Sequence, residues 1–293
     1  MNKRAFGQTG LWVSALGFGA MHLNDESTSE VEAGRLLNQV LDAGINLIDT
    51  ARGYGLSEER IGRHIAHRRS EYVLSTKVGY GIPGFADWSY DCIVAGVQAA
   101  CQRMRTDVID IVHLHSCPLQ VLQQGDVVRA LEDCQSSGKL RVAAYAGDND
   151  ELRWAIESDR FGSLQTSVSL CDQSNLTQQL AQAPSRRLGV IAKRPLAGAV
   201  WRFADRPADH AHGLYWDRFH AMGMDPQGLD WGELALRFSA FAPGVTSAIV
   251  GTSKSKNFQR NLDIVNRGPL DAPTQALITQ TFADCNDGWN SII

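Results

Sequence analysis

Short apolar segments recur along this chain of 293 residues, mostly at intervals of about 25 to 35 residues, the spacing of repeated βα units. Each segment is apolar throughout, a pattern typical of parallel strands buried on both faces of a sheet. This regular spacing constrains the fold more than any other feature of the sequence. The eight segments are Ser14–Phe18, Ile45–Asp49, Tyr72–Lys77, Ile109–His115, Leu140–Tyr145, Leu164–Val168, Gly189–Lys193 and Ser247–Val250.

The stretches between these segments carry helical periodicity. Ser29 and Glu32 have the spacing of a capping box, and Gly44 follows as the expected helix stop. Between them, apolar residues recur with the spacing of one helix face, at Ala33, Leu36, Leu37, Val40 and Leu41. A second pattern of this kind precedes the fourth strand, at Ile93, Val97, Ala100, Cys101 and Met104.

Eight such βα units predict an α/β fold, a closed (β/α)8 TIM barrel with an N-terminal β-strand or hairpin segment. The rival fold is an open doubly wound sheet, which usually carries a GxGxxG turn after its first strand. Gly17-Phe18-Gly19 lacks the third glycine of that turn, which favours the barrel. Because no linker-like stretch interrupts the chain, we expect residues 1–293 to form a single domain.

The interval between the last two predicted strands is too long for one helix. We expect Arg202–Gly228 to form a long loop insert before the last strand, on the functional rim of the barrel. Aromatic side chains in and beside this insert are candidates for the wall of an apolar pocket, namely Trp201, Tyr215 and Trp216.

Composition excludes several classes of protein. With 28 basic and 32 acidic residues the net charge is −4, and no basic cluster indicates a nucleic-acid partner. The six cysteines form no CxxC pair, which is typical of thiols in a reducing compartment. The apolar run Leu11–Leu23 follows Lys3 and Arg4, but glycine and serine interrupt it and no cleavage site follows. No segment is long enough to span a membrane, and we expect a cytoplasmic protein.

The active sites of barrels lie at the carboxyl ends of the strands, so the polar residues there are the candidates. Asp49, Lys77 and His115 stand at such ends, and Gln165 lies early in its predicted strand. Because a buried charge needs a partner, we expect Asp49 and Lys77 to pair with each other. Tyr54 follows Asp49 in a loop bounded by glycines at positions 53 and 55.

Around these residues the sequence resembles the aldo-keto reductase family. The matching motifs are Asp49-Thr50-Ala51 through Tyr54-Gly55 to Ser57-Glu58 and Gly62, then Ile109-Asp110 to His115, and Gly251-Thr252-Ser253-Lys254 to Asn261. The likeness extends from Gly7-Gln8-Thr9-Gly10 to Asn261, nearly the whole chain. It implies an NADP(H)-dependent oxidoreductase that acts on a small carbonyl compound or its alcohol. The catalytic tetrad that it implies is Asp49, Tyr54, Lys77 and His115.

The chemistry of each tetrad member suits such a reaction. Tyr54 would protonate the carbonyl oxygen as hydride arrives, and its phenolate would remove the alcohol proton in reverse. A free tyrosine is too weak an acid for this at neutral pH. Lys77 beside the phenol would favour the phenolate, and Asp49 would keep Lys77 charged and oriented. His115 would orient the carbonyl oxygen and share its developing charge.

The segment that ends the last strand and opens a helix near Ser255 is a candidate anion site, because backbone N–H groups and the helix dipole converge there. It also fits a well-capped surface helix with solvated lysines. The resemblance implies contacts with the adenosine 2′-phosphate and adenine, and Lys254 and Arg260 favour NADP(H) over NAD(H). The implied cofactor-binding residues are Gly19, Ala20, Met21, Asp49, Gln165, Arg194, Pro195, Leu196, Gly251, Thr252, Ser253, Lys254, Asn257 and Asn261.

Two departures from the family pattern leave parts of the cofactor site open. Residues 146–149, Ala-Gly-Asp-Asn, replace a Ser-Asn pair that the family uses near the nicotinamide carboxamide. Lys193 stands where an aromatic residue often stacks on the nicotinamide. Because a cation is unfavourable beside oxidised nicotinamide, we expect Lys193 to turn away and Arg194 to cover the ring.

Two other functions remain open from the sequence. A nicotinamide-cofactor-sensing binding protein of the same fold would bind cofactor with little turnover. A metal-dependent hydrolase would use His113 and His115, which share one strand face. Because no second cluster supplies further ligands, we predict no metal site and expect His113 to be a satisfied interior histidine. The substrate and the oligomeric state are left open.

Overall fold

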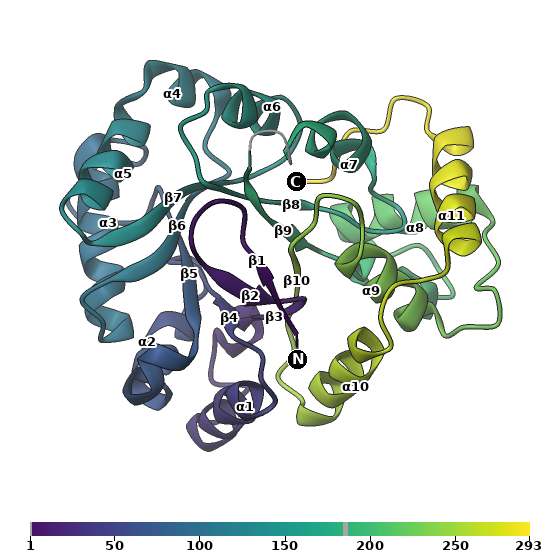
Figure 1. The fold of residues 1–293 in the computed structure, drawn as a ribbon, viewed down its shortest axis with the longest axis horizontal. Helices are drawn as coiled ribbons and strands as arrows, with labels where there is room; N and C mark the ends of the chain where they lie inside the picture. Colours follow the sequence, from purple (N-terminus) through teal and green to yellow (C-terminus); the bar gives the residue numbers. More distant parts are fainter. Residues whose placement is uncertain (1, 184–186) are drawn as a thin grey trace.

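A closed barrel of parallel strands forms the centre of the computed structural model, which describes residues 2–183 and 187–293 (Figure 1). Neighbouring strands follow the order β10-β3-β4-β5-β6-β7-β8-β9, which confirms the predicted (β/α)8 barrel. The strands are β1 (Lys3–Ala5), β2 (Trp12–Ser14), β3 (Leu16–Gly19), β4 (Leu47–Asp49), β5 (Val73–Val78), β6 (Ile109–His115), β7 (Leu140–Ala146), β8 (Ser163–Ser167), β9 (Gly189–Lys193) and β10 (Ser247–Val250).

Helices surround this barrel (Figure 1). The α-helices are α1 (Glu30–Asp42), α2 (Ser57–His64), α3 (Tyr90–Met104), α4 (Leu119–Gln124), α5 (Asp126–Ser136), α6 (Asn149–Glu157), α7 (Ser174–Gln178), α8 (His210–Met222), α9 (Trp231–Ala240), α10 (Ser255–Asn266) and α11 (Ala272–Cys285). The 3-10 helices are η1 (Ala20–Leu23), η2 (Ala66–Glu71), η3 (Leu180–Gln182) and η4 (Ala197–Arg202). Within the described residues, none of these helices is long and apolar enough to cross a membrane.

Local sequence signals explain where helices begin and pack. The predicted capping box at the start of α1 is present, because Ser29 and Glu32 each bond the backbone of the other. In α2, Gly62 faces the end of α3 so closely that a Cβ atom there would lie 2.1 Å from the carbonyl oxygen of Arg103. A glycine is therefore required for these two helices to pack at this distance.

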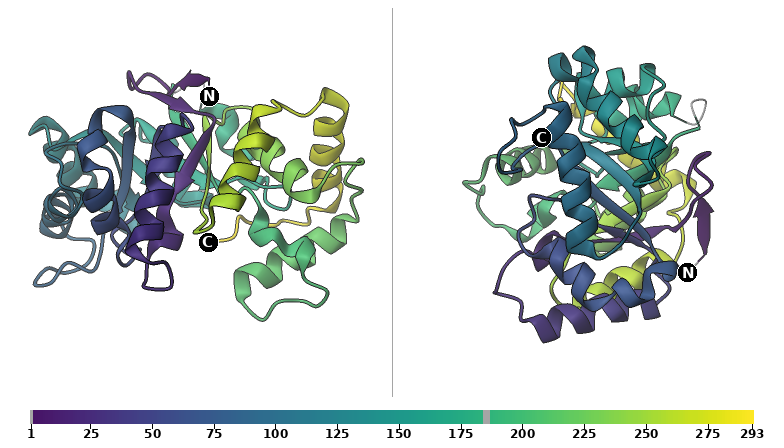
Figure 2. Two further views of the ribbon diagram at one scale, coloured as in Figure 1. Left: turned by 90° about the horizontal axis from the view of Figure 1, so that it is seen from below. Right: turned by 90° about the vertical axis from the view of Figure 1, so that its left-hand side faces the viewer.

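The antiparallel hairpin of β1 and β2 lies at one end of the barrel, whereas α8 and the C terminus lie toward the opposite end (Figure 2). This hairpin confirms the predicted N-terminal segment. The prediction that Ser14 starts the first barrel strand was wrong, because Ser14 ends β2. Its hydroxyl donates to the carbonyl oxygen of Leu16 at 2.6 Å, and its backbone N–H donates to Asn46 Oδ1 at 2.7 Å. These bonds hold the turn between the hairpin and β3.

The side chains inside the barrel change from apolar to polar along its axis. Hairpin residues pack with an apolar group near the start of the barrel strands, which includes Leu47, Val73, Ile111, Val142 and Ile191. Because side chains of a strand alternate between faces, the residue two positions later points the same way. In β4, β5 and β6 those next residues are Asp49, Ser75 and His113. The carboxyl ends of the strands therefore carry the polar groups.

The prediction that Arg202–Gly228 is a loop was wrong for its central part, which forms α8. The Asp209 carboxylate accepts a hydrogen bond from the backbone N–H of His212 and caps the helix, and Gly223 ends it with φ of 51°. The apolar residues of α8 do not follow a clear helical stripe, so periodicity did not indicate this helix. Tyr215, expected to line a pocket, belongs to α8 and is buried.

Candidate active site

A buried ion pair joins the carboxyl ends of β4 and β5, as the sequence predicted. Lys77 Nζ lies 2.7 Å from Asp49 Oδ2 and donates to the carbonyl oxygen of Thr50 at 2.8 Å. Both charged side chains are only 2% exposed. Burial by itself lowers the pKa of Lys77, but the charges of Asp49 and Tyr54 outweigh burial and raise that pKa above its ordinary value. Lys77 is therefore an ammonium ion held in the interior.

Tyr54 lies in the loop after β4, directly over this ammonium group. Lys77 Nζ is 5.1 Å from the centroid of the Tyr54 ring. The loop turns tightly, since the backbone N–H of Tyr54 bonds the carbonyl oxygen of Ala51 at 3.0 Å. The next residue, Gly55, has φ of 45°, and a Cβ atom there would lie 2.1 Å from the carbonyl oxygen of Asn24. Only glycine fits this turn.

His115 ends β6 on the other side of Tyr54. The two rings meet edge to face, with centroids 6.0 Å apart and an interplanar angle of 85°. Burial, together with the positive charges of Lys77 and Lys193, lowers the pKa of His115 to about 3, so the imidazole is neutral at physiological pH. The structure thus brings all four predicted tetrad residues together. Their catalytic roles stay a prediction.

His113 lies one layer deeper in the barrel and is fully buried. Its Nδ1 atom makes only long contacts of 3.4 Å, with the Ser75 hydroxyl and the carbonyl oxygen of Thr76. Its Nε2 atom is buried and has no hydrogen-bond partner among the described residues, so the prediction of a satisfied histidine was wrong. Burial and the charge of Lys77 lower its pKa to about 4. In the described part of the chain, no three potential ligands gather into a metal site.

Two predicted cofactor residues lie side by side where β10 meets β3. A Cβ atom on Gly251 would lie 2.8 Å from the carbonyl oxygen of Gly19. Gly19 also pairs with Asp49 across β3 and β4, so it connects this segment with the buried ion pair. Ala20 and Met21 follow in η1, where Ala20 is buried and Met21 is exposed.

The first turn of α10 begins at Ser255, as predicted, and has no side-chain cap. The backbone N–H of Lys254 bonds the Thr252 hydroxyl at 3.0 Å, and the Lys254 side chain is exposed just before the helix. Ser253 and Asn257 are at least partly exposed here, and Asn261 lies about one turn further along. The interpretation as a well-capped surface helix does not fit, because the N–H groups of this turn lack a side-chain partner.

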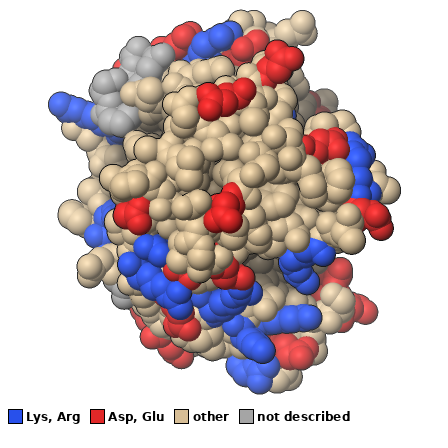
Figure 3. Space-filling view, turned by 90° about the vertical axis from the view of Figure 1, so that its right-hand side faces the viewer, with Lys and Arg blue, Asp and Glu red and all other residues tan. Residues whose placement is uncertain are grey.

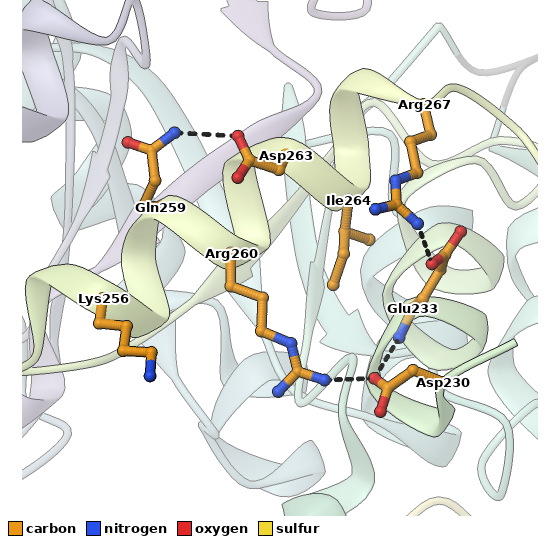
Figure 4. A pocket seen from close by; sticks show the side chains of 8 residues that line it. All are labelled: Asp230, Glu233, Lys256, Gln259, Arg260, Asp263, Ile264 and Arg267. Atoms are coloured by element: carbon orange, nitrogen blue, oxygen red, sulfur yellow. Dashed lines mark hydrogen bonds and ion pairs between the residues drawn. The ribbon is translucent and has the colours of Figure 1, made fainter.

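Arg260 turns toward α9, where its guanidinium pairs with Asp230 (Figure 4). Both residues line a cavity of about 670 Å³ between α9 and α10, together with the ion-paired Glu233 and Arg267. Figure 3 shows basic side chains gathered among acidic ones at the height of α10. None of the residues lining this cavity belongs to the tetrad. Because Arg260 is already paired, Lys254 is the better candidate for a phosphate contact.

The remaining predicted contacts lie in the middle of β8 and at the end of β9. Gln165 Nε2 donates to Asp49 Oδ1 at 2.9 Å and thereby supports the ion pair. Lys193 Nζ lies 2.7 Å from Asp148 Oδ2, so this cation is paired. Arg194 donates to the carbonyl oxygen of Ile292 in the C-terminal segment. Whether Gln165 and Arg194 contact a nicotinamide stays a prediction.

Pro195 and Leu196 continue from Arg194 toward η4. The carbonyl oxygen of Pro195 accepts a hydrogen bond from the Ser239 hydroxyl at 3.2 Å, and Leu196 packs partly buried against the apolar core. These contacts fix the position of this predicted cofactor-binding segment.

Comparison with known proteins identifies the family. The sequence profile of the Aldo/keto reductase family matches residues 15–281. The chain belongs to this family. Oxidoreductases are among its relatives. L-galactose dehydrogenase of Arabidopsis thaliana is 28% identical over 279 residues, and the match covers 89% of this chain and 87% of the dehydrogenase. A probable voltage-gated potassium channel subunit beta of the same plant is 27% identical over 320 residues, and the match covers 93% of this chain and 94% of that subunit.

Solved structures agree with this family assignment. An aldo-keto reductase from Bacillus halodurans, in its holo form, has a TM-score of 0.83 to this chain. The two are 26% identical, and the match covers 96% of each chain.

Sequence reasoning missed one aromatic residue of the candidate site. The hydroxyl of Tyr80, in the loop after β5, lies 2.8 Å from Nδ1 of His115. The signal was present, because Gly79-Tyr80-Gly81 repeats the glycine-flanked pattern of Tyr54 at the end of a neighbouring strand. A tyrosine in such a turn at the carboxyl end of a barrel strand is a candidate for the site.

Proposed function

We propose that this protein transfers a hydride between NADP(H) and the carbonyl carbon of an aldehyde or ketone, or oxidises the corresponding alcohol. The observation that carries the proposal is the buried Asp49–Lys77 pair beside the ring of Tyr54, with neutral His115 facing that ring. Bound NADPH supplies the hydride. A cytoplasmic location is part of the proposal, and it suits six cysteines that form no disulfide in the described residues.

In this mechanism Tyr54 donates its phenolic proton to the carbonyl oxygen. The Lys77 ammonium stabilises the negative charge left on the phenol oxygen, because burial strengthens their attraction. Asp49 keeps Lys77 charged, and Ser75 and Gln165 hold Asp49 in place. Neutral His115 donates an N–H bond to the same carbonyl oxygen and stabilises its developing charge.

The start of α10 has the donor groups that the adenosine 2′-phosphate of NADP(H) needs. Backbone N–H groups without a side-chain cap and the exposed ammonium of Lys254 meet there, at the positive end of the helix dipole. Ser253, Asn257 and Asn261 would supply further polar contacts. This donor set supports NADP(H) over NAD(H) as the cofactor.

Replacing Lys254 by methionine should weaken NADPH binding roughly tenfold and leave NADH binding almost unchanged, because only NADPH carries the phosphate that the ammonium would contact. Titration of tryptophan fluorescence with each cofactor measures both affinities. Lys256→Met removes a charge from the first turn of α10 and is the matched control. Equal weakening by both variants, or tighter binding of NADH by the native protein, would contradict the assignment.

A second function is supported by the relative named as a probable potassium channel subunit beta. The residues that replace the Ser-Asn pair also support it, because Asp148 pairs with Lys193 in the described structure. In that case the chain binds NADP(H) as a sensor with little turnover. Steady-state assays with NADPH and a panel of aldehydes, ketones and sugars distinguish the two, and we expect sustained cofactor oxidation. Stoichiometric cofactor binding without turnover on any compound of the panel would favour the sensor.

A further inference from the structure

Tyr80 occupies a fixed position between an indole ring and the imidazole of the candidate site. Its ring meets Trp88 edge to face at 5.9 Å and stacks on His115 at 5.5 Å, with an interplanar angle of 26°. The preceding residue must be glycine, because a Cβ atom on Gly79 would lie 2.1 Å from the Trp88 ring. The backbone N–H of Trp88 also bonds the carbonyl oxygen of Gly79 at 2.7 Å. The loop therefore holds the Tyr80 ring against His115.

The contact between Tyr80 and His115 restricts where the imidazole carries its proton. A neutral imidazole has one N–H donor and one acceptor nitrogen. The phenol oxygen lies 2.8 Å from Nδ1, and a phenolic O–H is a better donor than its oxygen is an acceptor. If the phenol donates, Nδ1 accepts this bond and the proton of the ring sits on Nε2. Within the described residues no hydrogen bond reaches Nε2, so that N–H is available to a substrate.

We propose that Tyr80 is a positioning residue, which holds His115 as the Nε2–H tautomer and aims that N–H at the carbonyl oxygen. The inference rests on the proposed function, because it assigns His115 a donor role toward substrate. Burial, followed by the charge of Tyr54, raises the pKa of Tyr80, which keeps its hydroxyl protonated and able to donate. No carboxylate bonds His115 within the described residues, so the phenol takes the place of the acid group that usually orients a functional histidine.

The first test is nitrogen NMR of His115 in the protein without added substrate, which does not depend on turnover. We expect a protonated Nε2 and a hydrogen-bonded acceptor signal at Nδ1. In Tyr80→Phe, which keeps the ring packing, the Nδ1 signal should shift to that of an unbonded nitrogen. A proton on Nδ1 in the native protein would overturn the proposal, since Tyr80 would then be the acceptor. An Nδ1 signal unchanged in the variant would also overturn it.

The second test is kinetic. Tyr80→Phe should lower kcat and kcat/KM equally, by about tenfold, with NADPH affinity unchanged, because the lost bond acts on the transition state. Tyr72→Phe is the matched control, because the Tyr72 hydroxyl is buried without a described partner just before β5, at the opposite end of that strand. It should keep the native kcat. Native kcat in Tyr80→Phe would overturn the positioning role while leaving the reductase activity established.

If the native protein reduces no carbonyl compound, the proposed function fails, and the NMR result still decides how Tyr80 and His115 share their proton. If His115→Gln keeps native turnover, the donor role of His115 fails, and with it the role of Tyr80. The outcomes for the two proposals are therefore distinguishable.

Discussion

Replacing Tyr54 by phenylalanine should lower kcat for carbonyl reduction about 10³-fold, the scale at which a positioned general acid contributes to catalysis. The hydroxyl is the proton donor in the proposed mechanism, and phenylalanine keeps the ring that lies 5.1 Å from Lys77 Nζ. The loss should therefore come from the chemical step. Steady-state kinetics with NADPH and the best compound of the panel measures it.

Cofactor affinity provides the control for Tyr54→Phe. We expect the variant to bind NADPH as the native protein does, because the described contacts of Tyr54 are with Lys77, His115 and its own loop, and not with the α10 segment that would hold the adenosine phosphate. Lys77→Met should reduce kcat by a similar factor, since the phenol then loses the ammonium that stabilises its negative charge. Native turnover in Tyr54→Phe would exclude this phenol as the acid.

The barrel could be predicted because its strands are buried on both faces and carry continuous apolar runs. Ile109–His115 was predicted to its exact ends and forms β6. The tetrad could be predicted because each member stands at a strand end or in the loop that follows it, and the barrel brings all strand ends together. That residues 1–293 form one domain stays a prediction.

Side-chain partners could not be predicted in this way. Gln165 bonds Asp49 across 116 positions of sequence, and the choice between this carboxylate and a cofactor amide depends on the packing of distant strands. The helix α8 was missed because its apolar residues follow no single stripe. The glycine-flanked pattern of Tyr80 marks it as a candidate for the site, but its contact depends on the direction of the His115 side chain, which periodicity does not encode.

Acid should destabilise the fold through its buried histidines. A histidine has an ordinary pKa near 6.5 in the unfolded chain, whereas the pKa of His113 in the folded protein is about 4. Between pH 6.5 and about 4 the unfolded chain therefore binds a proton that the folded chain does not. As a result, the free energy of unfolding decreases as the pH is lowered through this range. Between pH 7.5 and 5 this loss amounts to about 2 kcal/mol for His113.

Two other buried groups contribute to the pH dependence of the free energy of unfolding over the same range. His115 acts in the same direction as His113, because its folded pKa is also lowered. Asp172 acts in the opposite direction: burial raises its pKa to about 6, so the folded chain gains stability as pH falls below that value. The change in total stability between two pH values is therefore not the contribution of His113 alone.

His113→Leu isolates that contribution. Leucine is apolar and removes the Nε2 atom that has no described partner, so the variant should be at least as stable as the native protein at pH 7.5. Its advantage should grow by about 2 kcal/mol at pH 5, since only the native chain loses the His113 contribution. Urea unfolding at both pH values measures the difference, with His67→Leu, an exposed site, as the control. If the free energy of unfolding changed equally with pH in His113→Leu and in the native protein, His113 would have the same pKa in the folded and unfolded states. This result would contradict the prediction.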